Sequence, residues 1–195
     1  MGKIILTLAI TAVLVSNGLA ADDFNLRTSK GFKCGLNMAG INSEGLDMKG
    51  DGAFGIFVNH PLSPRFAVQP ELLYVVNGSS GGFFSYDYDL NLIYIEIPVL
   101  FQYPFATWGR FVPHLTAGPE IGFLVSAENK GEDVSDEFKS TDFGFVYGLG
   151  FKILFNNNNG LTFDINITNG LTNVFDTEDD EGENESCSFM FGYFF

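Results

Sequence analysis

The chain has 195 residues, of which 24 are acidic and 10 are lysine or arginine, so its formal net charge is −14 at pH 7. That charge argues against nucleic acid as a partner, and the length is enough for one domain. The sequence also contains 23 glycines, 22 phenylalanines and 7 tyrosines, which suit a structure with small interior positions and an aromatic exterior.

The N-terminus has the pattern of a cleaved secretory signal peptide. Lys3 precedes an apolar run at residues 4–15, and small residues precede the expected cleavage after Ala20. The run is too short for a transmembrane helix, which needs about 20 apolar residues, and no later segment has that pattern. We therefore expect a signal peptide at residues 1–20 and one domain at residues 21–195. If that domain spans a membrane, it must do so as a closed barrel.

Alternating apolar residues predict eight strands, because every second side chain of a strand lies on the same face. In chain order we expect them at residues 31–39, 52–59, 65–76, 90–103, 111–126, 143–155, 161–168 and at the C-terminus. The alternation is clearest in the sixth strand, where every odd position from Phe143 to Phe155 is apolar. The opposite face of that strand carries Gly144, Gly148 and Gly150.

The last strand is aromatic on one face. Phe189, Phe191, Tyr193 and Phe195 alternate up to the end of the sequence. Such a face suits lipid, although alternation alone also fits a half-buried sheet of a soluble protein. A terminal aromatic residue at this spacing resembles the sorting signal that the barrel-assembly machinery reads. We therefore expect these four residues to form an assembly signal and that machinery to be a partner.

The lengths of the predicted connections alternate. Those after the second, fourth and sixth strands are short, whereas the others have roughly ten residues or more, as in transmembrane barrels with short periplasmic turns and longer extracellular loops. We therefore predict an all-β fold, an eight-stranded antiparallel up-and-down transmembrane β-barrel in contact with outer-membrane lipid. The alternatives are an open soluble sandwich and a lipocalin-like barrel, whose apolar face would point inward.

The faces opposite the apolar ones would build the lumen of this barrel. They carry nine polar or charged residues: Lys33, Gln69, Glu71, Glu96, Gln102, His114, Glu120, Lys152 and Asp164. Buried charges need partners, so we expect a network of ion pairs and hydrogen bonds. An eight-stranded barrel is only just wide enough for its own side chains, which argues against a broad channel. Acids outnumber bases in this set, which leaves room for trapped water, a cation or protonated carboxylates.

Other acidic residues concentrate in two stretches that we expect to be solvated extracellular loops. The first contains Glu128, Glu132, Asp133, Asp136 and Glu137. The second contains Asp176, Glu178, Asp179, Asp180, Glu181, Glu183 and Glu185. The second stretch lacks the ligand spacing of an EF-hand, so we expect no dedicated metal site. Divalent cations that bridge lipopolysaccharide, or a surface protein, are candidate partners of these loops.

The sequence contains no convincing catalytic site. Carboxylates such as Glu71 and Glu96 could perform acid–base chemistry, but structural packing is the commoner role of such pairs inside small barrels. His60 and His114 both map to the periplasmic end, and no Ser-His-Asp constellation can be assembled on one rim. We expect no enzymatic activity and no cofactor.

The two cysteines lie on the first and last strands, which pair when the barrel closes. The compartment permits disulfides, but a simple register separates Cys34 from Cys187 by about five residues, or roughly 16 Å at ~3.3 Å per residue. That separation is too long for a disulfide. We expect free thiols, with a disulfide as the alternative.

Four segments are similar, in order and spacing, to recurring pieces of a known family: residues 68–74 (VQPELLY), 94–100 (YIEIPVL), 114–119 (HLTAGP) and the glycine-rich 143–150. They resemble the PorT-like outer-membrane β-barrel family. The resemblance implies a single eight-stranded outer-membrane barrel. The founding member of that family is associated with protein secretion across the outer membrane, and many relatives have no assigned role.

The function predicted from these features is a structural or surface-interaction role in the outer membrane. Acidic extracellular loops would stand above a lumen that side chains largely fill. A narrow channel for ions or small solutes, and an accessory factor in protein secretion, are the alternatives.

Overall fold

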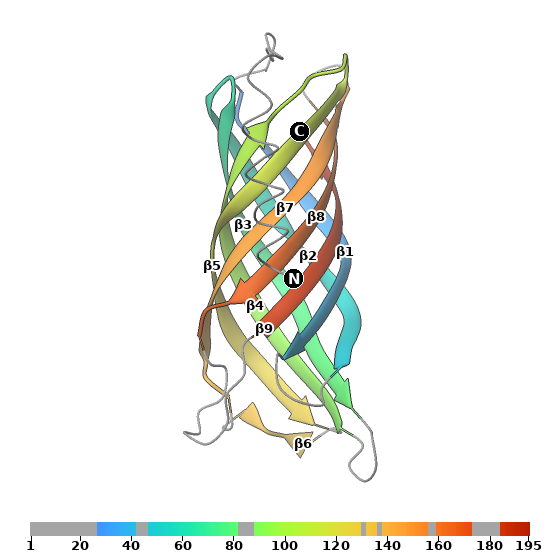
Figure 1. Ribbon diagram of the computed structural model, residues 1–195, viewed down its shortest axis with the longest axis vertical. Coiled ribbons are helices and arrows are strands. Elements are labelled where there is room, and N and C mark those ends of the chain that lie inside the picture. The colour runs from blue at the N-terminus through green and yellow to red at the C-terminus, as the bar shows by residue number, and fades with distance from the viewer. Residues whose placement is uncertain are drawn as a thin grey trace.

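Eight long antiparallel strands form a closed barrel, and one two-residue strand extends a hairpin beyond its rim (Figure 1). The computed structural model describes residues 27–41, 47–81, 88–129, 132–135, 138–155, 159–172 and 184–195. The predicted signal peptide lies outside the described residues. So do Asp136 and Glu137 of the first acidic stretch and every acidic residue of the second stretch except Glu185.

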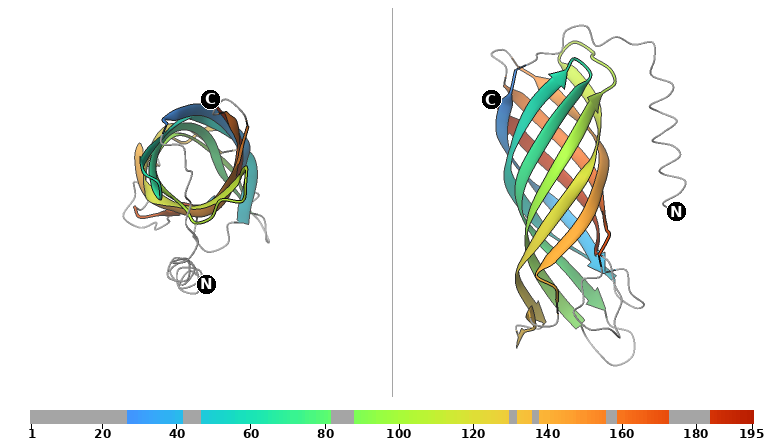
Figure 2. Two further views of the ribbon diagram at one scale, coloured as in Figure 1. Left: turned by 90° about the horizontal axis from the view of Figure 1, so that it is seen from above. Right: turned by 90° about the vertical axis from the view of Figure 1, so that its left-hand side faces the viewer.

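The strands follow the apolar alternation of the sequence. Their bounds are β1 (Ser29–Ile41), β2 (Asp47–Ser63), β3 (Phe66–Gly81), β4 (Tyr88–Pro104), β5 (Phe111–Asn129), β6 (Glu132–Asp133), β7 (Thr141–Leu154), β8 (Gly160–Gly170) and β9 (Asn184–Phe194). The sheet order is β4-β3-β2-β1-β9-β8-β7-β5-β6, and the additional pairing of β4 with β5 closes the barrel. Viewed from above, the strands form a ring (Figure 2). The predicted eight-stranded antiparallel barrel is confirmed.

Most strands are longer than the sequence predicts. β2 continues through His60 to Ser63, so the connection to β3 shrinks to Pro64 and Arg65. Strands β3 and β5 likewise extend past their predicted ends. Alternation marks only the part of a strand whose two faces meet different surroundings, whereas hydrogen bonding continues beyond it.

The short strand β6 was not predicted. It pairs with the end of β5, where Glu128 lies opposite Asp133 and Asn129 lies opposite Glu132. Part of the first acidic stretch is therefore an extended hairpin and not an irregular loop. Glu185, predicted as a loop residue of the second stretch, lies within β9 opposite Asn169, because β9 begins before its aromatic alternation does.

The apolar faces of the strands point outward. Large apolar side chains are exposed all around the barrel, among them Phe32, Leu36, Phe54, Ile56, Leu72, Phe101, Leu149 and Phe191. The intervening inward positions are largely buried. This arrangement is the one that a lipid environment requires, and it is the inverse of the lipocalin-like alternative.

The two ends of the barrel differ in their connections. The β2–β3, β4–β5 and β7–β8 connections lie at one end, which we call the short-turn end, and the remaining connections lie at the long-loop end (Figure 1). The C-terminus lies at the short-turn end, where the backbones of Lys30 and Phe195 exchange hydrogen bonds of 3.0 and 2.9 Å. Aromatic rings stack at the same end, including Trp108 on Phe111 with 5.8 Å between ring centroids.

Across the described residues, no helix has both the length and the apolar character needed to cross a membrane.

Candidate functional site

The lumen gathers the polar residues that the sequence analysis assigned to it. Seven of the nine are buried: Lys33, Gln69, Glu71, Gln102, His114, Lys152 and Asp164. The other two, Glu96 and Glu120, are half-buried and line a cavity. The inward positions of the barrel therefore form the candidate site.

An ion pair lies in the half of the lumen nearer the short-turn end. Lys33 on β1 places Nζ 2.8 Å from Glu71 Oε1 on β3 and 3.5 Å from Asp164 Oδ2 on β8. The same Nζ lies 5.3 Å from the centroid of the Phe57 ring. Buried charges are tolerated when they are paired and hydrogen-bonded. This lysine therefore joins three strands across the lumen.

Asp164 has further partners. His114 Nε2 lies 2.9 Å from its Oδ1, and Thr162 donates its hydroxyl to Oδ2 at 3.1 Å. Glycine is required beside this group, because a Cβ at Gly150 would overlap the Asp164 carboxylate and lie 2.9 Å from His114 Nε2. The glycine face of the predicted sixth strand thus makes room for the carboxylate and the imidazole.

Amide side chains connect this ion pair to the second lysine. Asn59 Nδ2 donates to Gln69 Oε1 at 3.0 Å and to Gln102 Oε1 at 2.9 Å. Gln69 Nε2 donates to Glu71 Oε1 at 2.7 Å, and Lys152 Nζ donates to Gln102 Oε1 at 2.8 Å. We call these side chains, together with Lys33, His114, Thr162 and Asp164, the Lys33 network.

A cavity lies beside this network, on its long-loop side. Its lining includes Glu71, Glu96, Glu120 and Asn166 together with the hydroxyl residues Thr168, Ser186 and Ser188. About 20 Å³ is available there to the centre of a water molecule, whereas roughly 10–15 Å³ is enough for one water. Asn37 donates to Asn77 at 2.6 Å, and Asn77 donates to Glu96 Oε1 at 3.1 Å. We call this space the acidic cavity.

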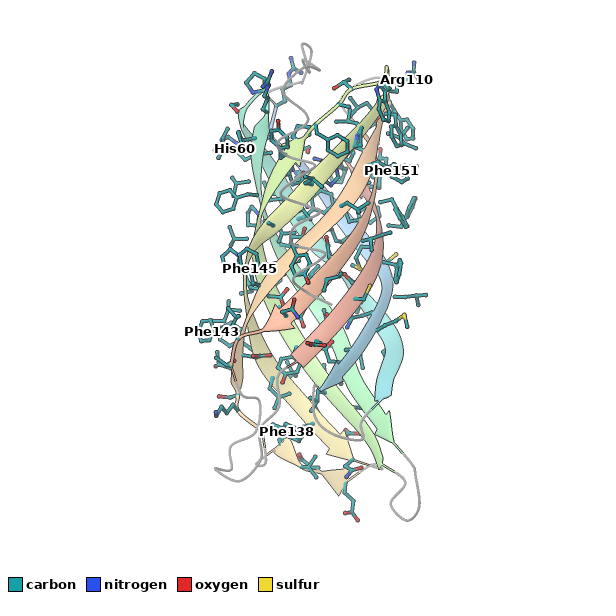
Figure 3. All side chains as sticks on the ribbon, in the orientation of Figure 1. His60, Arg110, Phe138, Phe143, Phe145 and Phe151 are labelled. Carbon is teal, nitrogen blue, oxygen red and sulfur yellow. The ribbon has the colours of Figure 1, made fainter. Side chains whose placement is uncertain are left out.

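An apolar cluster lies beyond the acidic cavity, toward the long-loop end. Phe138, from the β5–β7 connection, is buried with Leu92 and Tyr94 of β4 and Ala127 of β5. Figure 3 places Phe138 beside β6, at the end opposite His60 and Arg110. We call this cluster the Phe138 cluster. The second cavity, near Lys152 and Val112, leaves no space for the centre of a water molecule.

The sequence analysis missed several residues of this site. Asn59 was expected only as the last residue of a strand, and Asn37 and Asn77 were not assigned to the lumen. Asn37 and Asn59 lie on the inward faces of predicted strands, so the same alternation identifies them, whereas Asn77 lies one residue beyond the predicted end of its strand. Phe138 had no such signal, because a single aromatic residue among acidic ones does not indicate that a connection folds into a barrel.

The exposed acidic residues that the structure describes lie at the long-loop end. Glu128, Glu132 and Asp133 are exposed. The Ser135 hydroxyl and backbone N–H hydrogen-bond to Asp133, and these bonds lower the pKa of its carboxyl group. Within the described ranges, no group of three or more His, Cys, Asp or Glu side chains is arranged to hold a metal ion. The predictions of no catalytic and no metal site stay predictions.

The aromatic residues of the proposed assembly signal face outward on β9. Phe189, Phe191 and Phe195 are exposed and Tyr193 is half-buried. Recognition of these four residues by the barrel-assembly machinery stays a prediction.

Both cysteines are free, as expected. Cys34 lies opposite Phe191 and therefore four positions from Cys187 along β9. The predicted offset of about five residues is wrong by one, and the thiols remain too far apart along the strand for a bond at ~3.3 Å per residue.

Solved structures with the same architecture come from several bacterial outer membranes. Neisserial surface protein A (NspA) is 15% identical, with a TM-score of 0.55 over 84% of this chain and 95% of that one. The outer membrane protein OprG from Pseudomonas aeruginosa is 11% identical, with a TM-score of 0.51 over 88% of this chain and 97% of that one. At these identities the likeness concerns the fold alone. A comparison with curated proteins finds no match.

Sequence models of protein families identify the group to which the barrel belongs. The model described as "Outer membrane protein beta-barrel domain" matches residues 6–195, which is nearly the whole chain. The narrower PorT-like resemblance is not confirmed by this match. With its outward apolar faces and closed sheet, the chain belongs to the outer membrane protein beta-barrel domain family and is a small transmembrane barrel of the outer membrane.

Proposed function

We propose that this protein is a closed barrel with a structural or surface-interaction role, which presents acidic residues at its long-loop end. The observation that carries the proposal is the filled lumen. Hydrogen bonds and ion pairs link side chains from β1, β2, β3, β4, β5, β7 and β8. The acidic cavity leaves only about 20 Å³ for the centre of a water molecule.

The filled lumen argues against transport of solutes larger than water or a bare ion. An eight-stranded barrel has little interior space beyond its side chains. Here Lys33 lies across that space, and the Phe138 cluster packs on the inner faces of β4 and β5 toward the long-loop end. A solute would have to displace a buried ion pair. That pair is costly to open, since a broken buried pair leaves an uncompensated charge.

The exposed acidic residues support an interaction role. Glu128, Glu132 and Asp133 extend from the rim formed by β5 and β6. Their negative charge is suited to divalent cations that bridge lipopolysaccharide or to a basic patch on a surface protein. Outer-membrane lipid contacts the exposed apolar faces, and the aromatic end of β9 is suited to reading by the barrel-assembly machinery.

A narrow ion conductor is the second candidate. It is favoured by the half-buried carboxylates of Glu96 and Glu120, which line the acidic cavity. A role in protein secretion rests on the PorT-like resemblance alone.

Conductance of the purified protein in planar bilayers separates the two candidates. We expect near silence from the unmutated protein, because the Lys33 network fills the lumen nearer the short-turn end. Steady cation-selective conductance would instead favour the channel.

The interaction role is tested separately by cross-linking in intact outer membranes. A variant carrying Glu128→Gln, Glu132→Gln and Asp133→Asn should lose cross-linked products while the barrel stays folded. Cross-linking that is identical in the two proteins would count against these residues as the contact surface.

A further inference from the structure

We propose that the short-turn end of the barrel binds the headgroups of anionic phospholipids through its arginine side chains. Short turns face the periplasm in barrels of this class, so these lipids would belong to the periplasmic leaflet of the outer membrane. This surface lies at the end opposite the exposed acidic residues and is independent of the proposed surface role. Three observations support it: the distribution of charge, the geometry of one turn and the aromatic rings around it.

Basic residues concentrate at the short-turn end, although the chain as a whole has a formal net charge of −14. Every arginine of the sequence lies there: Arg27 precedes β1, Arg65 belongs to the β2–β3 connection and Arg110 belongs to the β4–β5 connection. All three are exposed, as is Lys30 on β1. No aspartate or glutamate occurs in the segments that form this end, which are residues 27–31, 59–66, 103–111 and 153–161.

The two arginines of the turns carry most of this positive charge. The carboxyl group of Phe195 also lies at the short-turn end, next to Lys30, with whose backbone Phe195 exchanges hydrogen bonds. Arg65 and Arg110 come from neighbouring turns, because β3 pairs with β4. The ring of Phe66, which follows Arg65, lies 5.3 Å from the ring of Tyr103 near the end of β4. These two arginines are therefore the side chains to which we assign the binding of an anion.

The turn that carries Arg110 is fixed by its own backbone. Trp108 N donates to Phe111 O at 2.8 Å, and Phe111 N donates to Trp108 O at 3.1 Å. Gly109 has a φ of 64°, in the left-handed region that glycine adopts without strain. The rings of Trp108 and Phe111 stack with an interplanar angle of 1°. Arg110, which Figure 3 places at the rim of this end, therefore belongs to a rigid turn with an indole ring.

Exposed aromatic rings place these arginines at the level of lipid headgroups. Phe66, Trp108 and Phe195 are between 50% and 62% exposed, and the aromatic girdles of transmembrane barrels lie at the membrane–water interfaces. A guanidinium group matches the geometry of phosphate with two parallel hydrogen bonds. Zwitterionic and anionic phospholipids both carry that phosphate, but only an anionic lipid balances the positive charge of this end. The occupant is therefore an anionic phospholipid.

Fluorescence of Trp108, the only tryptophan of the chain, tests which lipid lies beside this end. The purified barrel is placed in phosphatidylcholine vesicles with a small fraction of brominated phosphatidylglycerol or of brominated phosphatidylcholine. The bromines occupy the same acyl positions in both lipids and quench a neighbouring indole. We expect phosphatidylglycerol to occupy sites beside Trp108 about threefold more often, because basic residues near the membrane surface attract anionic lipids. High salt should reduce this preference by screening the exposed charges.

Matched variants assign the lipid preference to the arginines. Arg65→Gln combined with Arg110→Gln should remove most of it, whereas lysine at both positions keeps the charge and should retain most of it. Lys139→Gln removes an exposed cation at the long-loop end and should leave the preference unchanged. Arg65→Gln alone leaves the turn of Trp108 unaltered. It should lower the preference measurably, and it provides the test should the double variant fail to fold.

Equal quenching by the two brominated lipids in the unmutated protein would overturn the proposal. So would a preference that survives both glutamine variants, or one that Lys139→Gln also abolishes. Heat-dependent mobility on SDS gels checks that each variant is folded. None of these results alters the cross-linking test of the acidic residues at the opposite end.

Discussion

The two halves of the lumen use the same inward positions in different ways. Near the short-turn end, cations and anions are matched, and Lys33 holds Glu71 and Asp164 in one hydrogen-bonded network. Near the long-loop end, Glu96 and Glu120 line a cavity, and an apolar cluster lies beyond it. The comparison teaches that a narrow barrel can combine a dense polar core, which resists opening, with a small unfilled space.

Removing the charge of Lys33 should have the largest effect on this comparison. Lys33→Met leaves Glu71 and Asp164 buried without their shared partner and should lower the free energy of unfolding by about 3–5 kcal/mol. Urea titration of the barrel in lipid vesicles measures the loss. Lys30→Met is the matched control on the same strand, because Lys30 is exposed and its Nζ lies 5.5 Å from the Phe195 ring. Equal losses would mean that the Lys33 network does not stabilise the barrel.

The tight packing of the short-turn half is tested by adding one methyl group. Gly150→Ala should cost about 1–3 kcal/mol, because its Cβ would overlap the Asp164 carboxylate. Gly122→Ala, in the long-loop half, should cost less, since the nearest atom to its Cβ is a ring carbon of Tyr94 at 3.3 Å. The same vesicle titration compares the two variants. A larger loss at Gly122 would reverse the assignment of dense and open halves.

Truncating Phe138 tests the apolar cluster that lies between the acidic cavity and the long-loop end. Phe138→Ala should cost about 1–2 kcal/mol, below the roughly 3–5 kcal/mol of a central Phe, because its ring comes from a connection and not from the barrel wall. We expect no steady conductance in planar bilayers, since the Lys33 network still fills the lumen on the other side of the acidic cavity. Steady conductance of this variant would show that the Phe138 cluster, and not the Lys33 network, blocks the path.

The smallest effect is expected outside both halves. Glu132→Gln changes an exposed side chain at the rim and should alter the free energy of unfolding by no more than about 0.5 kcal/mol. Vesicle titration at low and high salt gives this value. A loss comparable to that of Lys33→Met would imply that β6 is part of the stabilising structure.

Alternation also explains which parts of the candidate site could be read from the sequence. Lys33, Glu71 and Asp164 occupy inward positions on well-marked strands, so their burial could be predicted. Their contacts could not, because they depend on the tilt and register of strands that are distant in the chain. Lys33 and Asp164 are 131 positions apart. Asn59 was overlooked because it is the last residue of a predicted strand, yet it joins two branches of the network.

The sequence by itself determined the number of barrel strands, their lipid-facing sides and the alternation of short and long connections. These properties are local, since the side-chain period of a strand depends only on neighbouring residues. Only the tertiary structure decided which lumen charges are paired, where space remains and which apolar residues pack beyond it. Barrel closure sets the register that brings Lys33 to Asp164, and the path of one connection brings Phe138 to Leu92. Glu96 and Glu120 remain beside a cavity for the same reason: the registers of β4 and β5 place no lysine opposite them.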